Sequence, residues 1–225
     1  MNIGIIGYGK MGQAVEKTAT QKGHKIIFKI DSKNTNLLNN LTIKKVDLVI
    51  EFSTPSSALE NILFCLKNNK PIVSGTTGWT NKLPFVKEFC LSNGGSFLHA
   101  PNFSIGVNLF FEMNTYISRL IDNSIYHVTI EEKHHTMKID QPSGTAIHIA
   151  NNIKKNLQLN HVPIHSKRTG NVKGEHLVKY TSEMDEITIS HKAKNRDIFA
   201  KGAVLAAEFI KNKKGYFTMK DVLNF

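Results

Sequence analysis

The chain has 225 residues, of which 40% are hydrophobic and 21% charged, a composition typical of a globular protein with one large domain or two small ones. No apolar run approaches the roughly 20 residues of a membrane-spanning helix, and the N-terminus lacks the pattern of a signal peptide. Two cysteines exclude a disulfide scaffold. We therefore expect a soluble cytoplasmic protein with no membrane partner.

The net charge of +11 comes mainly from lysine, because only three of the 29 basic residues are arginine. The lysines are spread along the chain, whereas nucleic-acid readers cluster basic residues and use arginine for phosphates and bases. We therefore expect a solvated basic surface and no nucleic-acid partner. A positive field would also attract anionic substrates or cofactors.

Short β-branched runs alternate with helical patterns over the first hundred residues, which predicts βαβ units and a parallel sheet. Strands are expected over residues 1–6, 25–30, 46–52, 71–74 and 96–100, and helices over 11–22, 55–68 and 83–92. Thr54 is placed to cap the second helix with its hydroxyl, and Pro55 takes the first helical position.

The pattern changes after Pro101 to an α+β arrangement, so we expect a second domain with a boundary near residue 105. A helix over 107–121, a strand over 126–132, a polar loop and a helix over 145–158 are expected in turn. Residues 163–193 indicate two or three antiparallel strands. A last helix over 197–211 and a short tail finish the chain.

A glycine-rich segment, Gly7-Tyr8-Gly9-Lys10-Met11-Gly12, follows the first strand, opens the first helix and fits G-x-G-x-x-G. Glycines there allow a tight turn and let backbone amides approach a pyrophosphate. Asp31, at the end of the second strand, is placed to hydrogen-bond an adenosine ribose. The alternative is a glycine turn and a strand-ending Asp that bind no ligand. Lys33 is either a partner for a 2′-phosphate or a solvated lysine.

Two further loops follow the fourth and fifth strands, Gly75-Thr76-Thr77-Gly78 and Ala100-Pro101-Asn102-Phe103. Ligands bind at the carboxyl ends of the strands in open α/β sheets, so both loops are candidates to line a nicotinamide pocket. Tight structural turns are an equally good interpretation.

Polar side chains concentrate between residues 131 and 146: adjacent His134 and His135, then Lys138, then a Ser-Gly-Thr turn that opens a helix. A helix N-terminus with Lys and His nearby favours an anion. The segment therefore suits a carboxylate-bearing substrate, with an imidazole or the lysine as general acid.

Two alternatives stay open for this segment. One is a zinc site, but adjacent histidines seldom bind a single ion, and we expect no metal. The other is a polar loop in which Asp140 or Ser143 merely caps the helix.

Residues 134–146, together with the glycine-rich segment, resemble the 4-hydroxy-tetrahydrodipicolinate reductase (dihydrodipicolinate reductase) family. The family signature is His-His-x-x-Lys-x-Asp-Ala-Pro-Ser-Gly-Thr-Ala, and only Gln141 departs from it, in place of Ala. Residues 75–78, 100–107 and 191–196 are also similar to family segments. The chain is shorter than many members, chiefly in the second-strand loop and the antiparallel region.

The resemblance implies an α/β fold with a Rossmann-type dinucleotide-binding domain, residues 1–105 completed by 197–225. An α+β domain of residues 106–196 would bind substrate and build a homotetramer. The implied activity is the reduction of 4-hydroxy-tetrahydrodipicolinate, a small dicarboxylate, to tetrahydrodipicolinate in diaminopimelate and lysine biosynthesis. The implied cofactor is NADH or NADPH.

The family's functional positions carry over onto matching residues. His134 would be the proton donor or acceptor and Lys138 the proton donor, while His135 and the Gly144 and Thr145 amides hold substrate carboxylates. The dinucleotide would be bound by Gly7, Tyr8, Gly9, Lys10, Met11, Gly12 and Asp31, with Gly75, Thr76, Thr77, Ala100, Pro101, Asn102 and Phe103 near the nicotinamide.

Two other function classes compete with this interpretation. One is another two-domain Rossmann oxidoreductase, such as an amino-acid dehydrogenase, which has no reason to carry the His-His and Ser-Gly-Thr elements together. The other is a non-catalytic dinucleotide-binding module or a basic nucleic-acid-binding module, which would bind without turnover.

Overall fold

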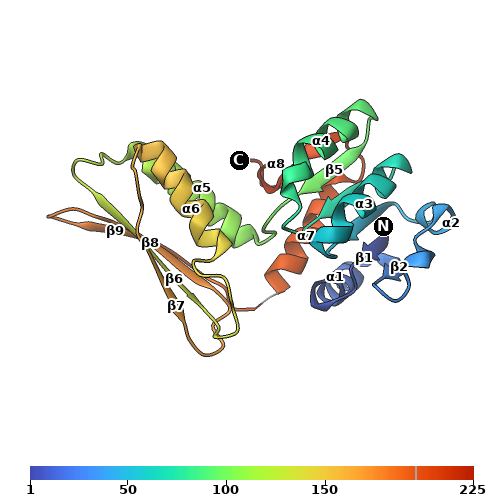
Figure 1. Cartoon of the computed structure of the whole chain (residues 1–225), viewed down its shortest axis with the longest axis horizontal. Coiled ribbons are helices and arrows are strands. Elements are labelled where there is room, and N and C mark those ends of the chain that lie inside the picture. The colour runs from blue at the N-terminus through green and yellow to red at the C-terminus, as the bar shows by residue number, and fades with distance from the viewer. Residues whose placement is uncertain (196) are drawn as a thin grey trace. The chain divides into compact units, whose positions relative to one another are not determined.

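The computed structural model describes residues 1–195 and 197–225, which form two compact units (Figure 1). The first unit comprises Met1–Ile105 and Asp197–Phe225, and the second comprises Gly106–Arg196. Arg196 itself, which ends one of the segments that resemble the family, lies outside the described residues. None of the described helices has both the length and the apolar character needed to cross a bilayer.

The first unit contains a six-stranded sheet in which every neighbouring pair is parallel. In the order in which they lie across the sheet, the strands are β2 (Lys25–Ile30), β1 (Asn2–Ile6), β3 (Leu48–Glu51), β4 (Ile72–Ser74), β5 (Ser96–His99) and β10 (Gly215–Phe217). The chain starts at β1 and adds β2 on one side and β3 on the other. This reversal of strand order marks the ligand-binding crevice of a doubly wound fold, and the expected α/β class is confirmed.

Helices cover both faces of this sheet, with α1 and α7 on one face and α3 and α4 on the other. The helical elements of the unit are α1 (Lys10–Gln21), η1 (Thr35–Leu37), α2 (Asn40–Ile43), α3 (Pro55–Lys67), η2 (Thr80–Lys82), α4 (Leu83–Ser92), α7 (Asp197–Ile210) and α8 (Met219–Leu223). All four residues of β3 are buried, as expected for a strand covered on both sides.

The C-terminal segment completes this unit. Helix α7 packs so closely that a Cβ on Gly202 would lie 1.7 Å from the carbonyl oxygen of Phe103. Strand β10 then pairs with β5. The expectation of a plain tail was therefore incomplete, because the tail contains the edge strand and a further helix.

The start of α3 departs from the expectation in one detail. Thr54 is the N-cap residue, yet its hydroxyl makes no capping bond to the helix backbone. It lies 3.0 Å and 2.9 Å from the hydroxyls of Ser56 and Ser57 instead. The helix therefore starts at Pro55 without the predicted side-chain cap.

The second unit is a four-stranded sheet with two helices packed on one face (Figure 1). Its elements are α5 (Ile105–Leu120), β6 (His127–His134), α6 (Gly144–Leu157), β7 (Ile164–Arg168), β8 (Glu175–Thr181) and β9 (Glu186–Lys192). Within residues 163–193, β8 and β9 form the expected antiparallel pair, whereas β7 runs parallel to β6 because α6 forms a crossover between them. Strand β6 continues through His134 instead of ending at Glu132.

The two faces of this sheet differ in chemistry. Val128, Ile130, Val178 and Tyr180 are buried beneath the helices. The other face carries charged residues, among them Lys179, which lies 3.6 Å from Glu131 and 3.8 Å from Glu186. Helices α5 and α6 pack on the first of these faces and leave the second uncovered within the described part of this unit.

Candidate active site

A pocket of about 550 Å³ lies in the first unit where the strand order reverses. Residues at the ends of β1, β2 and β3 form its walls, among them Gly7, Tyr8, Gly9, Asp31, Phe52, Ser53 and Thr54. An adjoining pocket of about 480 Å³ shares Gly9, Phe52 and Ser53 and adds Lys10, Met11, Gly75, Thr76 and Thr77. The structure thus brings the glycine-rich segment, Asp31 and the loop after β4 to one edge of the sheet.

The glycines of the first loop have distinct spatial roles. Gly7 has φ +91°, and a Cβ there would lie 2.0 Å from the carbonyl oxygen of Phe52. A Cβ on Gly12 would lie 2.3 Å from the carbonyl oxygen of Gly7. A Cβ on Gly9 would have nothing within 4 Å. Gly7 and Gly12 are therefore needed for packing, whereas Gly9 keeps open space in front of the loop.

The N-terminus of α1 faces this space without a side-chain cap. Gly9 is its N-cap residue, and the first turn contains no acidic residue. The first backbone N–H groups of a helix have no partner within the helix, and their partial positive charge favours an anion. These residues fit the pyrophosphate of a dinucleotide.

Asp31 combines a local role with its place in the larger pocket. Its Oδ1 accepts from the Lys33 N–H at 2.8 Å, and its own N–H donates to Asn34 Oδ1 at 2.7 Å. The carboxylate therefore stabilises the turn after β2 while it lines the pocket. A second acceptor oxygen is available to a ribose hydroxyl.

A buried carboxylate that the sequence reasoning missed supports both pockets. Glu51, at the end of β3, is fully buried and accepts from the Thr76 hydroxyl at 2.7 Å, the Ser53 N–H at 2.8 Å and the Ser74 hydroxyl. These bonds fasten the loops after β3 and β4 to each other. An acidic residue at the end of an otherwise apolar strand was the available signal.

The loop after β5 contributes to the core of the first unit. Ala100 and Phe103 belong to the hydrophobic core, and neither of the two pockets is lined by residues 100–103. Phe103 contacts the crevice indirectly, because its ring packs edge-on against Phe52 with centroids 5.6 Å apart. Because Phe52 lines both pockets, this contact places the loop after β5 beside the loop after β3.

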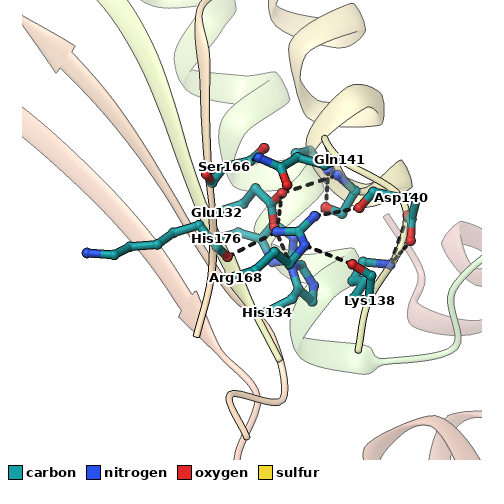
Figure 2. A network of polar contacts seen from close by, with 11 residues as sticks. Glu132, His134, Lys138, Asp140, Gln141, Ser166, Arg168 and His176 are labelled. Carbon is teal, nitrogen blue, oxygen red and sulfur yellow. Dashed lines mark hydrogen bonds and ion pairs between the residues drawn. The ribbon is translucent and has the colours of Figure 1, made fainter. Parts of the chain in front are cut away.

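In the second unit, a buried network surrounds His134 (Figure 2). Glu132 and His134 are two residues apart and both lie on the buried face of β6. His176 lies opposite Glu132 on β8. The Nδ1–H of His134 donates to one oxygen of Glu132, and Arg168 at the end of β7 donates from Nη1 to the other at 2.9 Å. Because a carboxylate only accepts, this contact places the proton on Nδ1 and the lone pair on Nε2.

The start of α6 is tied to the same carboxylate. Ser143 caps the helix by accepting from the Ala146 N–H at 3.2 Å, its hydroxyl lies 3.2 Å from His176 Nε2, and its N–H donates to Glu132 at 3.4 Å. Capping by Ser143, one of the interpretations left open, is confirmed. Gly144 and Thr145 form the first helical positions, and a Cβ on Gly144 would have open space around it.

The loop between β6 and α6 holds the remaining expected residues. Lys138 Nζ pairs with Asp140 at 2.7 Å and 2.8 Å, and the Lys138 N–H donates to the half-buried His135 carbonyl at 3.1 Å. Gln141, which departs from the family signature, donates to the Ser166 carbonyl at 3.4 Å. His134, His135, Lys138, Gly144 and Thr145 are thus gathered around one loop and one helix start.

Burial and charge set the protonation of this cluster. Burial lowers the pKa of His134, and its hydrogen bond to the Glu132 carboxylate opposes that shift. Burial lowers the pKa of His176 to about 3. Burial by itself would raise the pKa of Glu132, but hydrogen bonds from its neighbours, Arg168 and His134 among them, bring it below the ordinary value. At neutral pH both imidazoles are therefore neutral beside an ionised carboxylate.

The cluster also has ligand types that a metal ion uses. Donor atoms of Glu132, His134 and His176 lie within 4.8 Å of one another. However, Glu132 already binds the Arg168 guanidinium, which would repel a second cation. The arrangement fits a hydrogen-bonded acid–base network better than a metal centre.

Comparisons with known proteins agree with this arrangement. Residues 1–103 match the family model described as dihydrodipicolinate reductase, N-terminus, and residues 106–223 match the one described as dihydrodipicolinate reductase, C-terminus. A 4-hydroxy-tetrahydrodipicolinate reductase of Christiangramia forsetii is 45% identical over 100% of this chain and 98% of its own. One of Thermosipho africanus is 35% identical over 99% of this chain and 98% of its own.

A solved structure extends the likeness to the fold. Dipicolinate-bound dihydrodipicolinate reductase from Paenisporosarcina sp. TG-14 superposes with a TM-score of 0.83 and 25% identity, over 97% of each chain. The matches span both units, and they come from sequence and from structure. The chain belongs to the dihydrodipicolinate reductase family and is an oxidoreductase.

Proposed function

We propose that this oxidoreductase reduces 4-hydroxy-tetrahydrodipicolinate to tetrahydrodipicolinate in diaminopimelate and lysine biosynthesis, using NADH or NADPH. The observation that carries the proposal is the placement of His134 and Lys138 beside the start of α6, in a chain whose full-length relatives bear this enzyme's name. Membership in the family sets aside the alternatives of another Rossmann oxidoreductase and of a non-catalytic module.

The crevice of the first unit holds the dinucleotide in this proposal. The bound nicotinamide supplies a hydride. Backbone amides from Gly9 to Gly12 hold the pyrophosphate, and Asp31 accepts from the adenosine ribose. Glu51 keeps Gly75 and the neighbouring threonines at the edge of the crevice, where they line the nicotinamide end.

Cofactor choice depends on the residues after β2. The Asp31 carboxylate would repel a 2′-phosphate, and this favours NADH. Lys33 is two residues further and offers a cation to that phosphate. We propose that both cofactors bind and that Asp31 sets a preference for NADH.

The substrate carries two carboxylates, and the second unit offers the charges to bind them. His135 and Lys138 contribute side chains, and the Gly144 and Thr145 amides contribute the helix N-terminus, where Asp140 now accepts from the Gly144 N–H. Asp140, which now pairs with Lys138, must release it when a substrate carboxylate arrives. Dipicolinate, the ligand named for the Paenisporosarcina enzyme, presents the same two carboxylates.

Proton transfer completes the reduction. Once water has left the hydroxylated ring, hydride addition to the conjugated imine leaves an enamine that must gain one proton. Lys138 donates this proton to the enamine. Neutral His134 has a lone pair on Nε2, through which it accepts a proton and can return it. Because the positive groups face the developing anion before the reaction, they stabilise the transition state without reorganising.

We also propose that the enzyme is a cytoplasmic homotetramer, assembled through the face of the second sheet that no described helix covers. Support comes from the alternation of charged residues on that face, which allows copies to pair through Lys179 and its acidic neighbours. Sedimentation velocity checks the assembly, and a monomer at assay concentration would contradict it.

The test of the function is a coupled assay that follows loss of reduced-cofactor absorbance while substrate is generated enzymatically. Lys138→Ala should lower kcat on the order of 10²–10³-fold, because it removes the proton donor and a positive charge. Lys133→Ala, at an exposed position on the preceding strand β6, is the matched control and should turn over like the wild type.

Binding measurements separate turnover from folding. Lys138→Ala should keep its NADH affinity and lose affinity for dipicolinate. A folded Lys138→Ala enzyme with near wild-type kcat would contradict the assignment of the proton donor.

A further inference from the structure

Arg168 contacts both Glu132, the partner of His134, and the loop that carries Lys138 (Figure 2). Its Nη1 donates to Glu132 at 2.9 Å, its Nε donates to the Lys138 carbonyl at 3.2 Å, and its Nη2 donates to the Asp140 carbonyl. The guanidinium side chain is only 13% exposed. A fixed, planar donor fork therefore connects the end of β7 to the loop that carries Lys138.

The other oxygen of Glu132 continues the connection to His134. That oxygen accepts from His134 Nδ1, so one carboxylate binds the imidazole and the guanidinium together. The path runs from His134 through Glu132 and Arg168 to the main chain on either side of residue 139. In each step, either the Glu132 carboxylate or the Arg168 guanidinium supplies a charged group to the hydrogen bond.

Hydrogen bonds fix the Lys138 loop, among them those from the Thr136 N–H to the Gly170 carbonyl and from Gln141 to the Ser166 carbonyl. Its apolar side chains are not buried, since Met137 is 83% and Ile139 98% exposed. The loop therefore gains no packing energy from these side chains, and its position depends on its hydrogen bonds. The bonds to Arg168 are made to backbone carbonyls, so they hold the loop whatever the Lys138 side chain does.

We propose that Arg168 is a positioning residue that sets the place of Lys138 relative to His134, acting through Glu132 on one side and through the loop carbonyls on the other. The inference rests on the proposed roles of His134 and Lys138. Arginine suits this task because one rigid group reaches three acceptors, which a lysine ammonium on a flexible stem does not do.

The charges around His134 give the proposal a measurable signature. Four groups face this imidazole: Glu132 on its own strand, Lys138 in the loop, Arg168 on β7 and His176 on β8. Burial lowers the pKa of His134, Glu132 raises it, and the positive charges of Lys138 and Arg168 lower it. Removing Glu132 should therefore lower the His134 pKa, and removing the charge of Arg168 should raise it.

The experiment measures kcat against pH for Arg168→Lys, Arg168→Met and Glu132→Gln. Both Arg168 variants should lose about 10²-fold in kcat, the usual cost of a misplaced catalytic group, with unchanged NADH affinity. The inflection that disappears in His134→Asn should move to higher pH in Arg168→Met and to lower pH in Glu132→Gln. In Arg168→Lys it should stay in place, because the charge is kept while the fork is lost.

The matched control is Arg119→Met, which removes the same charge from an exposed position on α5 and should leave both kcat and the inflection unchanged. If Arg168→Met fails to fold, the contrast between Arg168→Lys and Glu132→Gln carries the test. Wild-type kcat in Arg168→Lys, or an inflection that moves in the same direction in Arg168→Met and Glu132→Gln, overturns the inference.

The proposed function and the positioning role of Arg168 can be disproved separately. Loss of activity in His134→Asn and Lys138→Ala with full activity in Arg168→Lys leaves the proposed function intact and removes Arg168 as its positioning residue. Full activity in His134→Asn and Lys138→Ala removes the proposed catalytic roles themselves.

Discussion

The two candidate sites are built from different parts of the polypeptide. In the first unit the crevice is formed largely by main chain, and the missing side chains of Gly7, Gly9 and Gly12 give it its shape. In the second unit the site consists of buried side chains, Glu132, His134 and His176, that continue the apolar stripes of β6 and β8. A main-chain site is sensitive to added atoms, whereas a side-chain site is sensitive to protons and charge.

The largest effect should come from adding one methyl group to the main-chain site. Gly7→Ala places a Cβ at positive φ and 2.0 Å from a carbonyl oxygen. The left-handed conformation and the overlap should together lower the free energy of unfolding by about 3 kcal/mol. Urea denaturation measures the loss.

Gly9→Ala is the matched substitution two residues away. Its Cβ meets no protein atom within 4 Å, so stability should be unchanged while NADH affinity falls, because the methyl group projects into the open space. Equal stability of the two variants would show that the crevice is less constrained than its geometry indicates.

A change of pH should act on the side-chain site instead. Burial lowers the pKa of His176 to about 3, while an unfolded histidine has a pKa near 6.5. Between these values the unfolded chain binds a proton at this residue that the folded chain does not. Stability is therefore lost as the pH falls, by about 1.4 kcal/mol per unit.

His176→Gln should remove this dependence while keeping a polar group beside Ser143. Lowering the pH from 7 to 5 should destabilise the wild type by about 2 kcal/mol more than the variant in urea denaturation. His127→Gln, at an exposed position on β6, should behave like the wild type. If the His176→Gln protein loses as much stability as the wild type, His176 is not the residue that takes up the proton.

The smallest effect separates the two roles of Asp31. Asp31→Asn keeps an acceptor for the Lys33 N–H, so the turn should persist, but it removes the charge that faces the ribose. The ratio of NADH to NADPH affinity should fall about tenfold, the scale of one charge-assisted hydrogen bond. Fluorescence titration measures both cofactors.

Asp122 provides a control in the other unit, since its carboxylate accepts from Ser124 in a similar turn. Asp122→Asn should not change the ratio. An unchanged ratio in Asp31→Asn would reduce Asp31 to a residue that ends its strand.

The same contrast explains what the sequence could predict. Main-chain sites leave a local signature, because the glycines, the strand and the helix start are contiguous, and the strands and helices of the first unit follow the expected order. The polar stretch around His134 was expected to be a loop. Its residues nevertheless keep the strand period of two, with Val128, Ile130, Glu132 and His134 buried in turn.

Side-chain sites depend on residues that only the fold brings together. Arg168 reaches Glu132 because β7 pairs with β6 in parallel, and nothing in the local sequence specifies that pairing. Ala100 and Phe103 follow a strand end, as expected, but the sequence did not predict that both side chains belong to the hydrophobic core. The spacing of residues along the chain predicts which side chains are neighbours within one helix or strand better than it predicts neighbours from different helices and strands.

The return of the chain to its first unit has a consequence for synthesis. When the ribosome has made residues 1–105, five of the six strands exist, but α7 and β10 are still to come. Ile5, Leu48 and Val73 pack in the same core as α7, and on that face they have only α1 for cover until residue 210 has been added. At 5–20 residues per second this interval lasts roughly 5–20 s, long enough for a chaperone to bind the nascent half.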